Sequence, residues 1–229
     1  MGYDSGAVNR VFRYFIFLVV ACGVSARAGL TDAEYYFPKL GVTSFDSLFF
    51  NRGAGALSRL REPSLFMLEH RGAAECYRVT LLPTREPPLC IRVTFATDGS
   101  AAARLKILSR NREGGLLAER TVLLSAEVAD GVRTAFKGTS FWKASPVGVG
   151  AEIDGTHWII EALAKEKYHV TCRPNIGDGA VREAATQPLG IFGGRKAAYK
   201  PYYDDLIARR KQADQRVRDE QERMISILP

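Results

Sequence analysis

The sequence predicts an α+β fold: an antiparallel sheet of about six strands, one covering helix and a charged C-terminal helix. Apolar and polar residues alternate with a period of two in several segments between 76 and 173, as in strands with one solvated face. Residues 126–137 and 201–228 have helical spacing instead. A hydrophobic fraction of 46% and a charged fraction of 25% are those of a globular chain. Intrinsic disorder is therefore excluded for its bulk.

The first 28 residues have the pattern of an export signal. Arg10 and Arg13 precede an apolar run over 14–21, and a small-x-small cleavage site ends at Ala28. The run is too short for a permanent transmembrane helix, which needs about 20 apolar residues. A second interpretation uses Cys22, because the segment that ends there resembles the lipobox of bacterial lipoproteins. Both interpretations place the mature chain outside the cytoplasm, periplasmic or secreted, with membrane attachment only if Cys22 is lipidated.

The net charge and the cysteine content indicate which class of partner and how many disulfides to expect. The formal net charge is +7, and loss of the export signal leaves about +5. This mild basicity suits anionic envelope surfaces and is no evidence for nucleic acid in an exported protein. An oxidising compartment would allow Cys76, Cys90 and Cys172 one disulfide and leave one thiol, without indicating which two residues pair.

Composition shifts divide the chain into four predicted parts: the export signal 1–28, an N-terminal arm 29–56, the α+β domain 57–190, and a linker with a charged helical tail 191–229. In the arm, Thr31 and Glu34 match a capping box, and Pro38 stops the helix soon after. A second short helix follows around Phe45. The glycines between 51 and 55 then indicate a linker.

The predicted sheet begins with a strand from Cys76, in which apolar residues alternate with Arg78 and Thr80 on an expected solvated face. Further strands are predicted over 90–96, 103–110 and 117–124. The amphipathic helix over 126–137 is expected to cover this sheet.

Two final strands, 157–163 and 167–173, are predicted to form a hairpin with a tight turn. In that register Trp158 lies opposite Arg173. Glu161 and Tyr168 then share one face of the sheet.

The tail 201–228 is predicted to be one long charged helix with a thin, broken apolar stripe. The stripe consists of Tyr203, Leu206, Ile207, Ala213, Val217, Met224 and Leu228. A coiled coil needs a fuller seam. Two interpretations therefore remain: a solvated or loosely docked helix, and a helix that binds an envelope protein partner.

Several short motifs occur together between about 60 and 190. They are Glu62-Pro63-Ser64-Leu65, Pro87-Pro88, Ile91-Arg92-Val93, Phe141-Trp142, Asp154-Gly155, Trp158, Glu161, Tyr168-His169 and Arg173. This set resembles the shared pattern of a group of uncharacterised exported bacterial proteins. The family pattern continues with Trp-Ser-Pro after the arginine, whereas this chain has Pro174. The resemblance implies export and an α+β domain, and it implies no particular activity.

Residues suited to catalysis or metal binding are few. His169 and Cys172 point to opposite faces of one strand, and His157 lies a strand-length away, so no metal site is expected. No cofactor is expected either. Asp154 and Glu161 are a carboxylate pair of the kind that cleaves glycosides. The competing interpretation assigns Asp154 to a turn and Glu161 to an ion pair with a nearby basic residue.

The candidate binding patch comprises Trp142, Trp158, Tyr168, His169 and Arg173, because Trp, Tyr and Arg are enriched in binding hot spots. Packing between sheet and helix is the alternative role, and burial distinguishes the two. We therefore expect an exported envelope accessory or interaction protein without enzymatic activity. A small hydrolase of envelope polysaccharide that uses Asp154 and Glu161 is the alternative.

Overall fold

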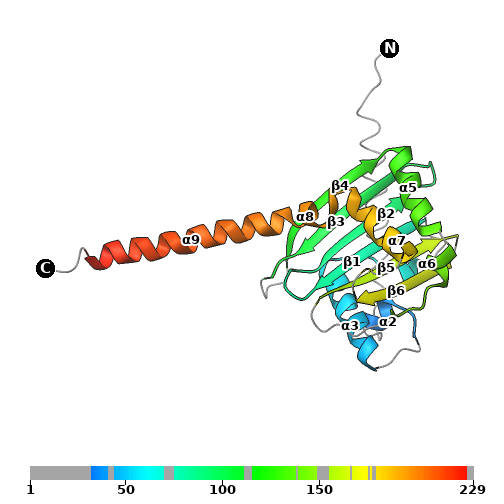
Figure 1. The fold of residues 1–229 in the computed structure, drawn as a ribbon, viewed down its shortest axis with the longest axis horizontal. Coiled ribbons are helices and arrows are strands. Elements are labelled where there is room, and N and C mark those ends of the chain that lie inside the picture. The colour runs from blue at the N-terminus through cyan, green and yellow to red at the C-terminus, as the bar shows by residue number, and fades with distance from the viewer. Residues whose placement is uncertain are drawn as a thin grey trace, which may run out of the picture.

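A single six-stranded antiparallel sheet forms the centre of the protein (Figure 1). The computed structural model describes residues 32–40, 44–69, 75–110, 115–137, 139–148, 155–165, 167–174, 176 and 179–225. The strand order is β4-β3-β2-β1-β5-β6. The strands are β1 (Cys76–Pro83), β2 (Leu89–Phe95), β3 (Ala101–Leu108), β4 (Leu116–Leu124), β5 (Thr156–Ala164) and β6 (Lys167–Pro174). The predicted α+β class and its six strands are confirmed.

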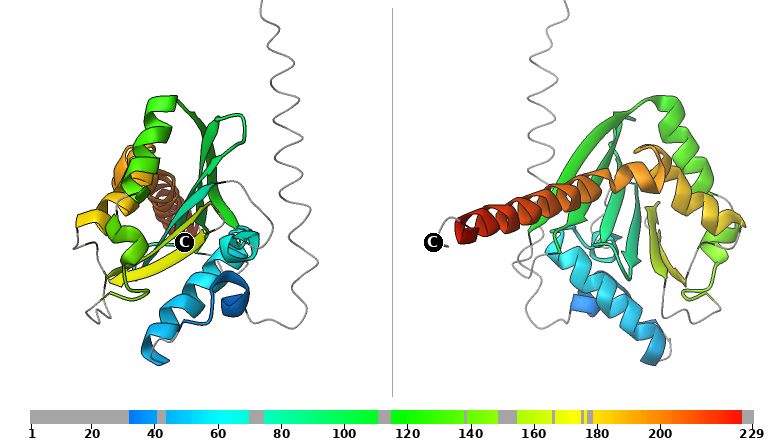
Figure 2. Two further views of the ribbon diagram at one scale, coloured as in Figure 1. Left: turned by 90° about the vertical axis from the view of Figure 1, so that its right-hand side faces the viewer. Right: turned by 60° about the vertical axis from the view of Figure 1, so that its left-hand side comes forward.

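Helices cover both faces of this sheet (Figure 2). One face carries α5 (Ala126–Lys137), α6 (Thr139–Lys143) and α7 (Gly179–Gly190). The other carries α2 (Asp32–Tyr36), α3 (Ser44–Arg59) and α4 (Leu65–Glu69). The single predicted covering helix, α5, therefore shares its face with α6 and α7, and the short helices predicted in the N-terminal arm cover the opposite face.

The core on the α5 side is largely aromatic and aliphatic. Phe136 of α5 stacks on Tyr77 of β1 at 4.3 Å between ring centroids and meets Phe141 of α6 edge-on at 5.1 Å. Helix α7 adds Ala184 and Leu189, both buried. These contacts use the odd-numbered, apolar positions of β1, as the alternation predicts.

The predicted linker at 51–55 is wrong, because these residues lie inside α3. Gly53 is buried, and a Cβ atom there would come within 2.1 Å of Ile159 Cδ1 on β5. Glycine thus permits close approach of the helix to the sheet. With Phe50 and Ala54 also buried, the N-terminal arm contributes to the core of the domain.

The predicted solvated face of the first strand is also wrong. Every residue of β1 is buried, including Arg78 and Thr80, which lie on the face that α2, α3 and α4 cover. The helices that cover this face precede the sheet in the sequence. Because most of their apolar residues belong to the predicted N-terminal arm, the sequence gives no sign that they cover β1.

The terminal hairpin has the predicted register. Trp158 pairs with Arg173 and Ala164 with Lys167. Strand β5 also pairs with β1, so that Glu161 lies directly opposite Arg78. This second pairing joins strands that are far apart in the sequence.

At the C-terminal end, α8 (Gly194–Ala198) leads into α9 (Lys200–Ile225). Tyr199 is fully buried and its hydroxyl donates to Pro87 O at 3.0 Å, so the predicted linker after 190 is partly packed on the body. Tyr203 donates to Glu86 at 3.1 Å. Beyond this anchored start, α9 projects away from the sheet (Figure 1).

Candidate functional site

The five residues of the candidate patch do not form one surface. Tyr168 lies on the face beneath α4, where its hydroxyl donates to Glu161 at 2.9 Å. Trp158, His169 and Arg173 occupy the opposite face, as their alternation along the hairpin requires. Trp158 is 6% exposed and belongs to the main core. By the burial criterion, Trp158 has a packing role, whereas half-buried Tyr168 contacts Phe66 of α4 and bonds to Glu161.

The remaining three residues lie around α6 and the loop that follows it. The rings of Trp142 and His169 are 6.0 Å apart, and Arg173 donates to Ser145 O at 3.0 Å. Burial lowers the pKa of His169, against the opposing effect of its hydrogen bonds to the backbone. All three side chains are half-buried. Their contacts hold the loop against β6.

A buried charge network crosses the other face of the sheet, under α3 and α4. It consists of Glu62, Arg78, Arg92, Lys106, Glu161 and Tyr168. Arg78 donates from Nε and Nη2 to the two carboxylate oxygens of Glu161, each at 2.6 Å, and both side chains are fully buried. A third donor of Arg78 reaches Pro63 O at 2.5 Å. This fork geometry is the strongest form of ion pair between these residue types.

Glu62 is the second centre of the charge network. Its carboxylate lies 2.7 Å from Arg92 Nε and 2.7 Å from Lys106 Nζ. Burial raises the pKa of Glu62, but Arg92, Lys106 and Arg78 together lower it further, to about 2. Lys106 also donates to Leu60 O at 2.7 Å at the end of α3, where a cation satisfies terminal carbonyls. The network thus attaches the N-terminal helices to three strands.

These contacts bear on whether Glu161 is half of a catalytic carboxylate pair with Asp154 or part of an ion pair. Asp154 lies outside the described residues. Glu161 is 0% exposed, with Arg78 and Tyr168 bonded to its oxygens. A carboxylate enclosed in this way cannot meet a polysaccharide chain. The geometry favours the ion-pair interpretation of Glu161 over the catalytic one.

The cysteines near the charge network are buried as well. Cys76 and Cys90 lie on the same face of β1 and β2 as Arg78 and are not bridged. Burial raises the pKa of both thiols, that of Cys90 to about 12. Cys172 is buried on β6. All three thiols are therefore unbridged in the structure.

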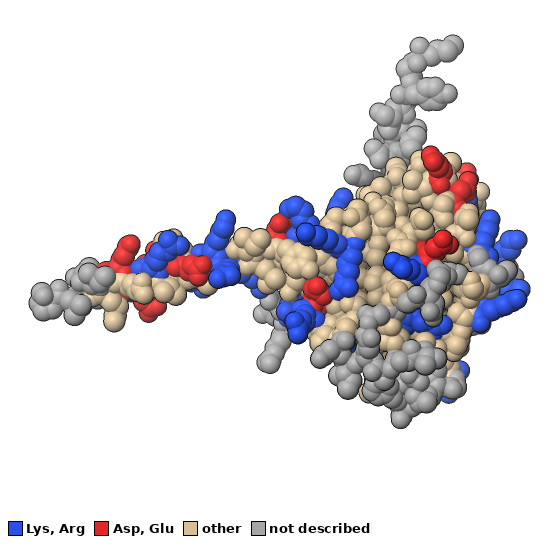
Figure 3. Space-filling view, in the orientation of Figure 1, with Lys and Arg blue, Asp and Glu red and all other residues tan. Residues whose placement is uncertain are grey.

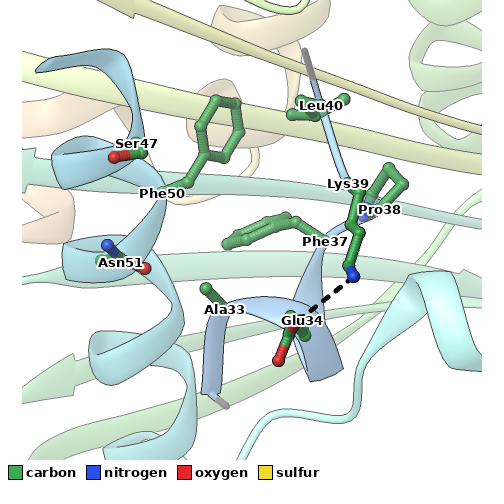
Figure 4. A pocket seen from close by; sticks show the side chains of 9 residues that line it. All are labelled: Ala33, Glu34, Phe37, Pro38, Lys39, Leu40, Ser47, Phe50 and Asn51. Atoms are coloured by element: carbon green, nitrogen blue, oxygen red, sulfur yellow. Dashed lines mark ion pairs between the residues drawn. The ribbon is translucent and has the colours of Figure 1, made fainter. Parts of the chain in front are cut away.

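The hollows in the described surface include one beside α2 and α3 and one against α7. One, of about 140 Å³, lies between α2 and α3 beside Phe37 and Phe50, with the Lys39–Glu34 ion pair at its rim (Figure 4). The other, of about 390 Å³, lies against α7, and its lining includes Trp158, Arg182 and Arg195. Arg195 is already paired with Glu86 at 3.1 Å. Neither hollow gathers the convergent polar groups of a catalytic pocket.

Helix α9 is the most distinctive surface of the molecule. Every residue from Leu206 to Met224 is exposed. The apolar side chains among them include Ile207 at 56%, Val217 at 54% and Met224 at 67% exposure. Basic and acidic side chains alternate along the projecting helix (Figure 3). The predicted stripe is therefore exposed from Tyr203 to Met224, and the described part of the chain leaves it uncovered there; its last member, Leu228, lies outside the described residues.

Across the residues that the structure describes, no group of three or more His, Cys, Asp or Glu side chains is placed to hold a metal ion. Among the same residues, no helix is long and apolar enough to cross a membrane. The predicted export signal and Cys22 lie outside them. Comparison with protein-family models and with curated proteins finds no match.

Proposed function

We propose that this protein is an exported accessory protein of the bacterial envelope, without enzymatic activity, which binds a protein partner through α9. The observation that carries the proposal is the uncovered helix: 19 consecutive residues, Leu206–Met224, are all exposed and carry a recurring apolar stripe.

Physical reasoning supports a binding role for such a helix. Isolated helices gain little stability from propensity alone, and most helices in proteins are stabilised by packing an apolar face. Ion pairs between Lys200 and Asp204 and between Arg209 and Asp205 support α9 locally; such pairs contribute only about 0.3–0.5 kcal/mol each. A partner that covers Leu206, Val217 and Met224 would remove apolar surface from water, which favours association.

The proposed location rests on the sequence. The pattern of residues 1–28 supports export, and Cys22 offers the lipid-anchored version of the same location. The resemblance to uncharacterised exported bacterial proteins supports it further. The buried, ion-paired state of Glu161 is the reason for preferring a binding role to the hydrolase alternative.

The proposal is tested by removing the apolar stripe and measuring the native mass of the chain in envelope extracts. In the test variant, Leu206, Val217 and Met224 become serine; in the control, exposed Leu123 and Val128 outside α9 become serine. Wild type and control should migrate in an assembly larger than one chain, and the test variant as a single folded chain. Equal migration of all three would overturn the proposal.

A further inference from the structure

The apolar stripe of α9 follows a regular spacing once its charged interruptions are included. Seven exposed positions succeed one another at alternating intervals of three and four residues: Tyr203, Leu206, Arg210, Ala213, Val217, Glu220 and Met224. This is the a/d spacing that places a helix seam against a partner helix. We call these seven positions the α9 seam. Its two charged members, Arg210 and Glu220, interrupt an otherwise apolar or small-residue row.

Within the six seam positions from Leu206 to Met224, the two charges are placed symmetrically: Arg210 is the second and Glu220 is the fifth. If a second α9 runs antiparallel with Ala213 facing Val217 of the copy, Arg210 faces Glu220 of the copy. In the same register Leu206 faces Met224. The charged pair and the apolar pairs are all matched by one register, and each match occurs twice because the arrangement has two-fold symmetry.

A parallel pair has no such match between seam positions, although Arg209 beside the seam would face Asp214 of the copy. It would place Arg210 against Arg210 of the copy and Glu220 against Glu220, and like charges at a packed seam cost several kcal/mol. From this contrast we propose that the partner of α9 is a second copy of this chain, bound as an antiparallel two-helix pair over residues 206–224. The overlap is about 27 Å long at 1.5 Å per residue. This inference rests on the proposed function of α9.

The residues beside the seam set the strength of the pair. Arg209, Arg216 and Arg223 form one row next to it, and in the antiparallel register this row faces the same row of the copy. Residues of this flanking row are offset from the seam layers, so Arg209 lies nearest Arg223 of the copy and Arg216 lies nearest Arg216 of the copy. Arg209 is partly neutralised by Asp205 at 2.8 Å. This like-charge row weakens the pair, so association should be readily reversible, in the micromolar range or above.

The test is sedimentation velocity of the purified full chain over a range of concentrations, with charge reversals in the seam. Wild type should shift from one chain to two as concentration rises. Arg210→Glu and Glu220→Arg should each weaken the dimer about tenfold or more, because each creates like-charged layers. The double variant, and an equimolar mixture of the two single variants, should regain the wild-type dimer. Arg218→Glu, the same charge change outside the seam, is the matched control and should leave the dimer unchanged.

A further variant separates the antiparallel register from other arrangements. Arg209→Glu places an acidic residue opposite Arg223 of the copy and should tighten the dimer severalfold. In a parallel pair, the glutamate introduced by Arg209→Glu would face Asp214 of the copy, and the dimer would be weaker. Thermal unfolding of each variant checks that the body is intact.

The outcomes distinguish this inference from the proposed function. If the purified chain stays monomeric while the extract assembly still depends on Leu206, Val217 and Met224, the antiparallel pair is overturned and a different partner covers α9. If both the purified chain and the extract contain only single chains, both proposals are overturned. A wild-type dimer that is lost in the single reversals and regained in their mixture supports the inference.

Discussion

The carboxylate of Glu62 lies where α3 ends, and two basic side chains from β2 and β3 reach it. Its pKa is lowered from an ordinary value of 4.5 to about 2. A group with a lowered pKa contributes stability above its unfolded value and loses that contribution as the pH falls toward its folded value. The free energy of unfolding should therefore decrease by about 3 kcal/mol between pH 4.5 and pH 2 from this residue.

Urea unfolding at a series of pH values measures this dependence, with Glu62→Gln as the comparison. In the variant, the free energy of unfolding should lack this decrease between pH 4.5 and pH 2. The variant should also be less stable than wild type at pH 7, because Arg92 and Lys106 remain buried without their counter-charge. An unchanged slope in Glu62→Gln would contradict the assigned role.

The ion pair between Arg78 and Glu161 predicts a second result at the residue scale. Glu161→Gln should cost about 3–5 kcal/mol in the free energy of unfolding, because a buried arginine loses its counter-charge. Replacing both partners, Arg78→Met with Glu161→Leu, should cost less than the single change. Denaturant titration of the three proteins measures this. A stable Glu161→Gln variant that had lost a polysaccharide-cleaving activity would instead support the hydrolase alternative.

Sequence distance explains which residue pairs could be predicted. Trp158 and Arg173 belong to one hairpin, so period-two alternation and a tight turn determine their pairing. Arg78 and Glu161 are 83 residues apart, and their contact depends on β5 joining the sheet beside β1. No local pattern contains that information. Alternation alone therefore predicts a solvated position for Arg78.

At the scale of elements, α3 gives a matched pair of substitutions. Gly53→Ala should lower the free energy of unfolding by about 1–3 kcal/mol, because the new methyl group overlaps the buried Ile159 side chain. At Gly55 no heavy atom lies within 4 Å of a new Cβ. Gly55→Ala should therefore raise the free energy of unfolding by up to about 1 kcal/mol through helix propensity. Chemical denaturation of both variants measures the contrast. Equal effects would place this segment outside a packed helix.

The helices that are longer than the sequence predicts share one physical cause. Helix α7 begins and ends with glycine and contains Pro188, and α3 contains two glycines. Local propensity therefore counts against both. Burial of Ala184 and Leu189 in one, and of Ala54 and Leu57 in the other, outweighs that propensity. Helices α5 and α9, with good local signals, were predicted.

The whole molecule consists of a body and a projecting helix with different physical roles. The body buries both faces of β1 and β5 at the middle of the sheet, and its charge network holds the N-terminal helices in place. Tyr199 and Tyr203 attach α9 to the body, whereas residues 206–224 are exposed. Residues beyond the attachment should therefore contribute to association and little to the stability of the body.

Site-specific photo-crosslinking in the producing cell is the most direct test of this account. A photoreactive residue replaces Val217 on α9 in one strain and Val128, exposed on α5, in another. The account predicts a discrete crosslinked product from position 217 and none from position 128, and a product of two chains if the helices pair with each other. Absence of any product at 217, or equal products at both positions, would contradict the claim that α9 is the binding surface.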